Sequence, residues 1–231
     1  MLRLDILTSK KFNISRTAAK ELILRGEVLV GGEICIKPSN LFDEESIVET
    51  KGLKYVSRGG YKLEHALKVF GFNPNGICID IGSSTGGFTD CLLKNGAKHV
   101  YAVDSGTNQL HSELKKNICV TSFENTNIKN FKLNFEVDLV TIDVSFISLE
   151  AVLPIAYDLL KKGGFCITLI KPQFELGKKG WVSKKNHKAI LIKVKNIAES
   201  LNFKVENKTS YGEEYFYLLS KSFMKKSFKG Y

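Results

Sequence analysis

The pattern of hydrophobic and polar positions divides the chain into a short N-terminal part and a longer part with regular alternation. From residue 61 onward, short apolar runs alternate with segments whose apolar residues recur at helical spacing. The runs predict strands at 77–81, 98–103, 118–121, 138–142 and 165–170. The segments between them predict helices at 61–70, 87–95, 107–116, 149–161 and 185–200. Such alternation is typical of an α/β fold of the Rossmann-like type, in which helices cover both faces of a mostly parallel, doubly wound sheet.

Two further apolar runs, 202–208 and 214–220, follow the last predicted helix and are joined by a turn at Tyr211-Gly212. This connection is too short to contain a crossover helix, so the two strands are expected to pair as a hairpin. We therefore predict that the final strand is antiparallel to the rest of the sheet.

The N-terminal part has a different pattern and is predicted to form a small α+β domain over residues 1–50. The segment SRTAAKELILRG has Ser15 as a helix N-cap, apolar residues at helical spacing and Gly26 as the stop signal. The segment EVLVGGEICI is typical of a β-hairpin that turns at Gly31-Gly32. A linker at 51–60 then leads into the α/β domain at 61–231.

The composition is that of an ordinary globular protein. Of the 231 residues, 43% are hydrophobic and 25% are charged, and no run of about 18 apolar residues could span a bilayer. The N-terminus lacks the apolar core and cleavage site of a signal peptide. The cysteines are odd in number and scattered, which favours free thiols over disulfides or a metal site; they are Cys35, Cys78, Cys91, Cys119 and Cys166. We expect a cytoplasmic protein with no metal and no membrane partner, either a monomer or a homodimer.

The positive charge is concentrated in the C-terminal third. Residues 161–231 contain 16 lysines and five acidic residues, whereas residues 1–160 carry a net charge of −1, and the whole chain carries +10. A basic segment of this kind favours a polyanionic partner, most simply a nucleic acid. The alternative is a set of solvated lysine faces without a ligand.

The segment CIDIGSSTGGFTDCLL is typical of a ligand-binding turn, because an apolar strand leads into a loop of small residues and then a helix. In a doubly wound sheet the turn after the first strand is the usual cofactor site. Glycines let a ligand approach the backbone closely, and hydroxyl residues supply hydrogen bonds. The residues concerned are Gly82, Ser83, Ser84, Thr85, Gly86 and Gly87.

The spacing of these glycines favours S-adenosylmethionine over NAD. A dinucleotide-binding turn follows the pattern G-x-G-x-x-G, whereas this turn has G-x-x-x-G-G and is preceded by Asp80. A pyrophosphate would meet that carboxylate unfavourably, but an ammonium and a sulfonium would be attracted to it. Asp104 ends the next strand, where a carboxylate can accept hydrogen bonds from ribose hydroxyls. NAD, and a glycine turn without any ligand, are the alternatives.

Four titratable residues are expected at one edge of the sheet. Asp143 and Lys171 end two apolar strands, Glu214 opens the last strand, and Lys62 begins the helix before the first strand. A lysine at the end of an apolar strand is unusual, because burying an unpaired ammonium costs free energy. The pattern favours a reaction site with two lysines and two carboxylates over ordinary surface charge.

These residues lie in motifs that carry a family resemblance. The segments SRGGYKL, DIGSSTGGFTDCLL, YAVDSGTNQL, DLVTIDVSFISL, LIKPQFELG and EEYFYLL resemble the TlyA family, FtsJ-like ribosomal RNA ribose methyltransferases often named hemolysins. The N-terminal part resembles an S4 RNA-binding domain. The resemblance implies methyl transfer from S-adenosylmethionine to the 2′-hydroxyl of a cytidine, in large-subunit ribosomal RNA or an assembled ribosomal subunit. Members of the family differ in whether they also modify the small subunit, and the sequence leaves both possibilities open.

The resemblance also implies roles for individual residues. The catalytic tetrad would be Lys62, Asp143, Lys171 and Glu214, with Glu213 as the alternative to Glu214. Lys171 is the candidate base for the hydroxyl proton, and Lys62 is a candidate to hold the substrate oxygen. The cofactor residues would be Asp80, Gly82, Ser83, Ser84, Thr85, Gly86, Gly87, Phe88, Asp104 and Glu124.

Basic residues in both parts are candidates for RNA contacts, because lysine and arginine neutralise phosphates. They are Arg3, Arg16, Lys20, Arg25, Lys37, Lys178, Lys179, Lys184, Lys185 and Lys188. Trp181, the only tryptophan, is placed either to stack on a base or to anchor its own loop.

Three other functions compete with this interpretation. An RNA-binding factor with an inactive methyltransferase domain is disfavoured, because all four tetrad residues and the cofactor loop are present. A membrane-active hemolysin is disfavoured, because the sequence has no spanning segment and no strongly amphipathic cationic helix. An NAD-dependent oxidoreductase is disfavoured by the glycine spacing.

Overall fold

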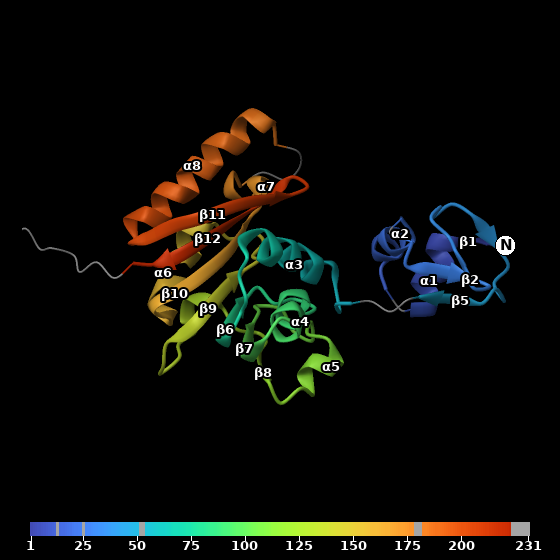
Figure 1. Ribbon diagram of the computed structural model, residues 1–231, viewed down its shortest axis with the longest axis horizontal. Helices are drawn as coiled ribbons and strands as arrows, with labels where there is room; N and C mark the ends of the chain where they lie inside the picture. The colour runs from blue at the N-terminus through green and yellow to red at the C-terminus, as the bar shows by residue number, and fades with distance from the viewer. Residues whose placement is uncertain (13, 25, 51–53, 178–181, 223–231) are drawn as a thin grey trace, which may run out of the picture. The chain divides into compact units, whose positions relative to one another are not determined.

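The computed structural model describes residues 1–12, 14–24, 26–50, 54–177 and 182–222, and the chain divides into two compact units (Figure 1). These units are Met1–Arg58 and Gly59–Tyr231. The division falls inside the linker expected at 51–60. Each unit is described by itself.

The larger unit is built on a seven-stranded sheet, and the predicted fold class is confirmed. The strand order is β11-β12-β10-β9-β6-β7-β8. The strands are β6 (Gly76–Ile81), β7 (Ala97–Val103), β8 (Val120–Phe123), β9 (Val137–Ile142), β10 (Leu160–Ile170), β11 (Phe203–Tyr211) and β12 (Glu214–Lys221). Strands β8, β7, β6, β9 and β10 are parallel, and β12 pairs with β10 in the antiparallel sense. The strand order reverses beside β6, where ligands bind in such sheets.

Helices cover both faces of this sheet (Figure 1). They are α3 (Arg58–Phe70), α4 (Gly87–Lys94), α5 (Ser112–Lys115), η1 (Ile128–Asn130), α6 (Leu149–Leu159), α7 (Pro172–Glu175) and α8 (Lys184–Ser200). Helices α6 and α8 share one core with alternate residues of the strands, such as Ile79 in β6 and Val140 in β9. Helix α4 packs on the opposite face, where Phe88 stacks on Phe216 with ring centroids 6.2 Å apart.

The smaller unit contains two helices and two small sheets. Strand β1 (Leu2–Arg3) pairs with β4 (Leu41–Phe42), while β2 (Val28–Val30) lies between β3 (Glu33–Ile34) and β5 (Val48–Thr50). Helices α1 (Leu4–Phe12) and α2 (Arg16–Leu24) pack together over a core that includes Leu4, Leu7, Leu22, Ile23, Val28 and Val48.

The predicted helix and hairpin of the smaller unit are both present. The Ser15 hydroxyl accepts a hydrogen bond from the Ala18 amide at 3.2 Å, so it caps α2. Gly31 and Gly32 have φ values of 59° and 84°, which a two-residue turn between β2 and β3 requires and which glycine adopts without strain.

The structure corrects two of the predicted elements of the larger unit. The helix expected at 107–116 is only the short α5, because Asn108 has a φ of +53°, which a helix does not allow. The Glu124 carboxylate binds the amides of Gln109 and Leu110 and fixes this segment before α5. The strand expected at 118–121 begins two residues later, because the Val120 amide bonds to the Asn117 carbonyl in a turn.

Candidate functional site

The loop between β6 and α4 has the tight geometry that its small residues predict. Gly82 has φ +83°, and a Cβ there would lie 2.5 Å from the carbonyl oxygen of Asp143. Gly86 has φ +97°, and a Cβ there would lie 2.3 Å from Leu114 Cδ1. Any other residue at either position would both strain the backbone and collide with a neighbour. Gly82 therefore lets the loop lie close to the end of β9, and Gly86 lets it lie close to Leu114 of α5.

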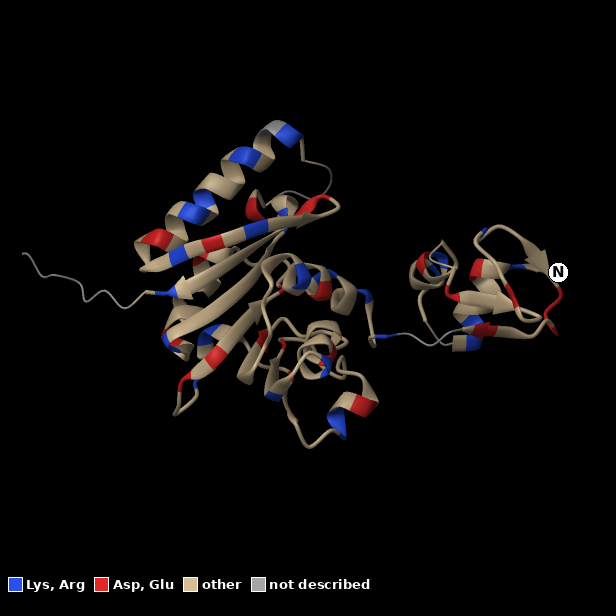
Figure 2. Cartoon of the chain, viewed as in Figure 1, with Lys and Arg blue, Asp and Glu red and all other residues tan. Residues whose placement is uncertain are grey.

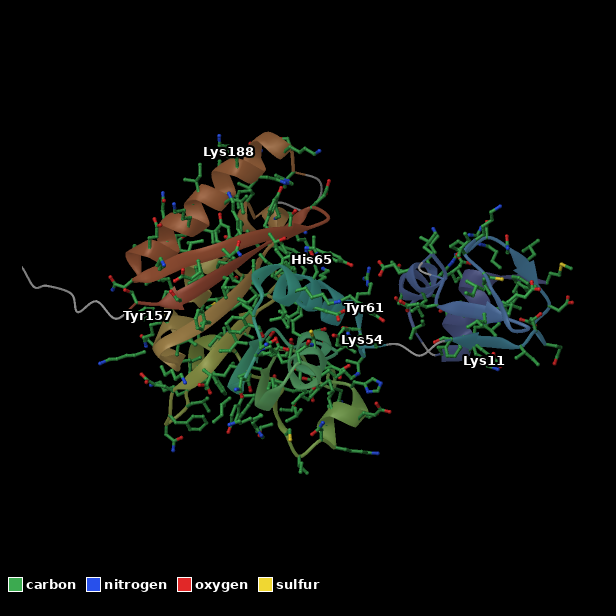
Figure 3. All side chains as sticks on the ribbon, in the orientation of Figure 1. Lys11, Lys54, Tyr61, His65, Tyr157 and Lys188 are labelled. Carbon is green, nitrogen blue, oxygen red and sulfur yellow. The ribbon has the colours of Figure 1, made fainter. Side chains whose placement is uncertain are left out.

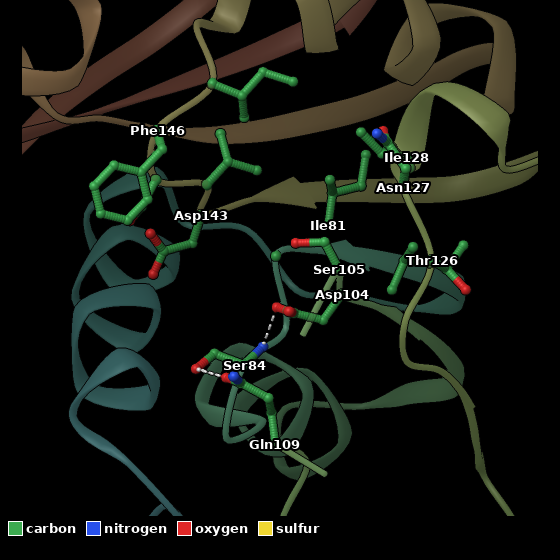
Figure 4. Close-up of a pocket in the computed structure, with 15 residues that line it drawn as sticks. Ile81, Ser84, Asp104, Ser105, Gln109, Thr126, Asn127, Ile128, Asp143 and Phe146 are labelled. Carbon is green, nitrogen blue, oxygen red and sulfur yellow. Dashed lines mark hydrogen bonds between the residues drawn. The ribbon is translucent and has the colours of Figure 1, made fainter. Parts of the chain in front are cut away.

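A cavity of about 490 Å³ lies beside this loop, at the carboxyl ends of β6, β7 and β9 (Figure 4). Its lining comes from four segments that are far apart in the sequence. The lining residues are Ile81, Gly82, Ser84, Val103, Asp104, Ser105, Gln109, Thr126, Asn127, Ile128, Asp143, Val144, Ser145, Phe146 and Ile147. We call this space the first cavity. It occupies the place where doubly wound sheets bind cofactors.

Asp104 is fixed in the wall of the first cavity by two backbone amides. Its carboxylate accepts hydrogen bonds from the amide of Ser84 at 2.8 Å and from the amide of Gly106 at 2.7 Å. Figure 4 shows the Asp104–Ser84 bond and a second bond from the Ser84 hydroxyl to Gln109. A carboxylate offers about four acceptor positions, so Asp104 can bind a ligand hydroxyl as well.

Asp80 lies beneath the loop and does not line the first cavity. Its carboxylate is fully buried and accepts hydrogen bonds from the hydroxyls of Thr89, at 2.7 Å, and Thr141, at 3.0 Å. Burial raises the pKa of Asp80 to about 7, although the two hydroxyl bonds act in the opposite direction. Asp80 therefore joins β6 to α4 and β9, whereas the sequence led us to expect it to face the cofactor.

Glu124 also has a different place from the expected one. Its carboxylate accepts hydrogen bonds from Lys115 Nζ at 2.6 Å and from the amides of Gln109, at 2.5 Å, and Leu110, at 2.9 Å. The Lys115 bond, together with the backbone bonds, lowers the pKa of Glu124 to about 2. Glu124 is absent from the lining of the first cavity and organises the segment that carries Gln109.

Of the ten residues expected to bind the cofactor, three line the first cavity: Gly82, Ser84 and Asp104. Ser83 and Phe88 are buried, and the Thr85 carbonyl accepts a hydrogen bond from the His111 amide at 3.1 Å. Gly86 caps α4 and Gly87 begins it. These five residues set the conformation of the loop without lining the cavity.

The four residues of the expected tetrad meet as two ion pairs. Lys62, in α3, donates to the Glu214 carboxylate at 2.5 Å. Lys171, directly after β10, pairs with Asp143, directly after β9, and lies 3.3 Å from the Ser145 hydroxyl. All four side chains are between 12% and 25% exposed. The two pairs are thus shielded but open to a substrate.

The sheet register explains why the two pairs are neighbours. Ile170 of β10 is opposite Tyr215 of β12 at the end of their antiparallel ladder. Lys171 and Glu214 are the next residues outward on each strand. An antiparallel last strand therefore brings the start of β12 to the carboxyl ends of the parallel strands, and Glu214 to the edge that carries Asp143.

A second cavity, of about 660 Å³, borders the other ion pair. It is lined by Lys62, Gln173, Val182, His187, Tyr211, Gly212, Glu213 and Glu214. Asp143 lines the first cavity, whereas Lys62 and Glu214 line the second. The tetrad therefore borders both cavities.

Phe146 is a site residue that the sequence analysis did not single out. Its side chain is 83% exposed, its φ is +67°, and its ring lies 5.0 Å from the ring of Phe174. It lines the first cavity near Asp143 (Figure 4). An exposed aromatic in a strained backbone conformation is uncommon. Phe146 lies in the motif DVSFISL, which the sequence analysis quoted. The sequence alone, however, does not show whether a phenylalanine in such a motif is exposed or buried in the core.

The candidate RNA residues of the smaller unit fall into two groups. Arg3 and Arg16 both bind the buried carboxylate of Asp5, with shortest N–O distances of 3.1 Å. These bonds lower the pKa of Asp5 against the effect of its burial. Lys20 and Lys37 are exposed. Arg25 lies outside the described residues.

The candidate RNA residues of the larger unit lie on and before α8. Lys184 and Lys188 are exposed, and Lys188 extends outward from the helix (Figure 3). Lys185 belongs to α8, but its side chain is not described. Lys178, Lys179 and Trp181 lie outside the described residues.

The described residues contain neither a membrane-spanning helix nor a cluster of metal ligands. No described helix is long and apolar enough to cross a membrane. No group of three or more histidine, cysteine or acidic side chains gathers there as metal ligands would.

Comparisons with known proteins agree with the expected family. Residues 55–223 match the FtsJ-like methyltransferase family, and residues 2–48 match the S4 domain. The chain is 46% identical over 190 residues to Hemolysin A of Brachyspira hyodysenteriae, covering 79% of each chain. It is 41% identical over 197 residues to the 23S rRNA (cytidine-2′-O)-methyltransferase TlyA of Campylobacter jejuni, covering 77% of each. A solved structure of a hemolysin-named protein from Streptococcus thermophilus matches 96% of this chain and 89% of its own, with TM-score 0.70 and 37% identity.

Proposed function

Because the chain belongs to the FtsJ-like methyltransferase family and to its TlyA group, we propose that it transfers a methyl group from S-adenosylmethionine to a ribose 2′-hydroxyl of ribosomal RNA. The acceptor that we propose is a cytidine of the large subunit, since the Campylobacter jejuni relative is named for that reaction. The protein would act in the cytosol, where ribosomal subunits are found.

Two neighbouring ion pairs, Lys171–Asp143 and Lys62–Glu214, are the main support for this proposal. A ribose hydroxyl is a weak nucleophile, and a base has to take its proton as the new bond forms. Lys171 pairs with Asp143, which lines the first cavity, and Lys62 lines the second, so two partly buried lysines can supply such a base without a histidine. No described histidine lines the first cavity.

The first cavity fits S-adenosylmethionine by its chemistry. Asp104 offers carboxylate oxygens to ribose hydroxyls. The hydroxyls of Ser84 and Thr126 donate to Gln109 and to the Glu124 carbonyl and can accept a further hydrogen bond from a ligand. Gly82 presents only backbone to the cavity. When bound, the cofactor supplies a methyl group on a positively charged sulfur. Asp80 would support this site from below, by holding the loop to α4 and β9.

Lys171 is the residue that we assign as proton acceptor. The Asp143 carboxylate orients Lys171 Nζ at the end of β9. Glu214 holds Lys62 beside the strand end of Lys171. To take the hydroxyl proton, Lys171 has to act as the neutral amine.

RNA docking would use the exposed lysines of both units. Lys20 and Lys37 of the S4 domain are free of the Asp5 cluster, so their charge is available to phosphates. Lys184 and Lys188 carry positive charge along α8 in the domain that holds the tetrad (Figure 2). The two surfaces together would recognise a large folded RNA.

The proposal is tested by cofactor binding and by transfer. Titration calorimetry with S-adenosylmethionine and with NADH should give heat of binding for the first and none for the second. Large ribosomal subunits that lack the modification should then gain label from labelled cofactor. Lys171→Ala should bind the cofactor normally and transfer nothing, because it removes the proton acceptor and leaves the 82–87 loop intact. Binding of NADH alone would contradict the reaction class.

A further inference from the structure

The second cavity has no assigned ligand, although it borders half of the tetrad. It shares no lining residue with the first cavity, and Lys62 and Glu214 form part of its wall. In an in-line methyl transfer the acceptor oxygen approaches the methyl carbon from the side opposite the sulfur, so the acceptor needs a space of its own next to the cofactor. With the cofactor in the first cavity, the second cavity is such a space, because the tetrad residues Lys62 and Glu214 line it.

Most polar side chains of the second cavity are already engaged. Lys62 and Glu214 bind each other. Both ring nitrogens of His187 are used, one with the Tyr215 hydroxyl at 2.9 Å and one with the Val182 carbonyl at 3.0 Å. His187 is only 6% exposed, so it fixes the start of α8 to β12.

Gln173 is different, because its carboxamide has no hydrogen-bond partner among the residues that the structure describes. The side chain lines the second cavity and is partly buried. Its polar atoms are not among the buried, unpartnered side-chain atoms of the described residues, so they are open to the cavity. An accessible carboxamide with unused donors and an unused acceptor is available to a ligand.

The backbone holds Gln173 at a fixed place two residues after the proposed base. The Lys171 carbonyl accepts hydrogen bonds from the amides of Phe174, at 3.0 Å, and Glu175, at 3.3 Å. Pro172 between them is buried, and its ring fixes φ. Glu175 in turn binds the Ser148 hydroxyl and the Leu149 amide, each at 3.0 Å. Hydrogen bonds at Lys171 and at Glu175 therefore fix the backbone on both sides of Gln173.

We infer that the second cavity receives the acceptor nucleoside and that the Gln173 carboxamide is a positioning residue that hydrogen-bonds its base. This inference rests on the proposed function. A carboxamide offers one acceptor and two donors, which match the exocyclic amine and the ring N3 of cytosine on one edge. Enzymes that take a nucleotide out of its stack read that edge in this way. Because the amide can rotate, Gln173 orients the base and does not by itself exclude uracil.

The test compares two glutamines that line different cavities. Gln173→Ala should lower kcat/KM for large ribosomal subunits on the order of tenfold or more, and leave the Kd for S-adenosylmethionine unchanged. Gln109→Ala, in the first cavity, should weaken cofactor binding and leave the KM for the subunits unchanged. The opposite pattern would overturn the inference.

A second variant separates binding from a purely structural role. Gln173→Glu keeps the size of the side chain, and a carboxylate is well tolerated in the first turn of a helix. A structural role predicts wild-type kinetics and melting temperature for Gln173→Glu. The inference predicts a normal melting temperature with kcat/KM at least as low as in Gln173→Ala, because a carboxylate faces the lone pair of N3. Wild-type kinetics in both variants would overturn this inference alone, whereas a wild-type protein that transfers no methyl would overturn the proposed function as well.

Discussion

Lys62 and Glu214 are 152 residues apart in the sequence and form a 2.5 Å hydrogen-bonded ion pair at the edge of the sheet. The contact joins a helix that precedes the first strand of the sheet to the antiparallel strand near the chain's end. Glu213, the neighbouring carboxylate, is exposed and has no ion-pair partner among the described residues. The geometry therefore favours Glu214 as the acidic residue of the tetrad.

A matched pair of variants tests that assignment. Glu214→Gln should lower methyl transfer by a factor on the order of ten or more, because Lys62 loses its counter-charge. Glu213→Gln should lower it no more than a few-fold. Both should melt within a few degrees of the wild type, since the Glu214 side chain is partly exposed and such pairs contribute about 1 kcal/mol or less. Equal loss of activity in the two variants would contradict the assignment.

Asp104→Ala should weaken S-adenosylmethionine binding. The variant removes an acceptor for the ribose hydroxyls and also the bonds to the amides of Ser84 and Gly106. The expected cost is about 1.5–3 kcal/mol in calorimetry. Asp158→Ala, at an exposed position on α6, is the control and should bind normally. Wild-type affinity in Asp104→Ala would refute the role of Asp104.

Asp80 should make stability depend on pH in an unusual direction. Its pKa is about 7 in the folded protein and about 4 when unfolded, so the folded state binds more protons between these values. The contribution of Asp80 to the free energy of unfolding is therefore complete below pH 4 and is lost as the pH rises through 7. Asp80→Asn removes the buried charge; its amide oxygen can accept from one of the two threonine hydroxyls, and its NH2 can donate to the other. The variant should be more stable than the wild type at pH 8, by up to roughly 4 kcal/mol. The difference should shrink towards pH 4. Urea unfolding at both pH values measures it, and an equal difference at both would contradict the shift.

Two charge-reversal variants of the S4 domain should distinguish a loss of RNA affinity from a loss of folding stability. Lys20→Glu should weaken RNA binding and reduce its salt dependence without changing the melting temperature, because Lys20 is exposed. Arg16→Glu should also lower the melting temperature, because it places a carboxylate against the buried Asp5. Filter binding in a series of salt concentrations and thermal melts provide the data. Unchanged RNA affinity in Lys20→Glu would contradict a docking role for this lysine and would favour the lysines of α8 as the docking surface.

The sheet and the tetrad could be predicted because their sequence signals are local. Asp143 and Lys171 each end a strongly apolar run, and parallel strands bring such ends to one edge. The antiparallel final strand followed from the short turn at Tyr211-Gly212. That strand brings Glu214 to the same edge. Periodicity and connection length were therefore enough to place three of the four tetrad residues.

Other features depend on contacts between distant residues and could not be predicted. The loss of the helix at 107–111 comes from Asn108, whose φ of +53° a helix does not allow, and from Glu124, which fixes the amides of Gln109 and Leu110 before α5. Helix α1 was not predicted, because threonine, serine and two lysines interrupt its apolar spacing. The direction of the Asp80 carboxylate depends on Thr89 and Thr141, whose hydroxyls point at it from other elements. Sequence spacing carries no information on such directions.

The central claim is that the acceptor is a ribose oxygen activated by Lys171. The most direct measurement is transfer from labelled S-adenosylmethionine to unmodified large ribosomal subunits, followed by digestion to nucleosides and mass spectrometry. The wild type should produce 2′-O-methylcytidine, and Lys171→Arg should produce none, because a guanidinium does not lose its proton near neutral pH. Label on a base ring, or full transfer by Lys171→Arg, would contradict the claim.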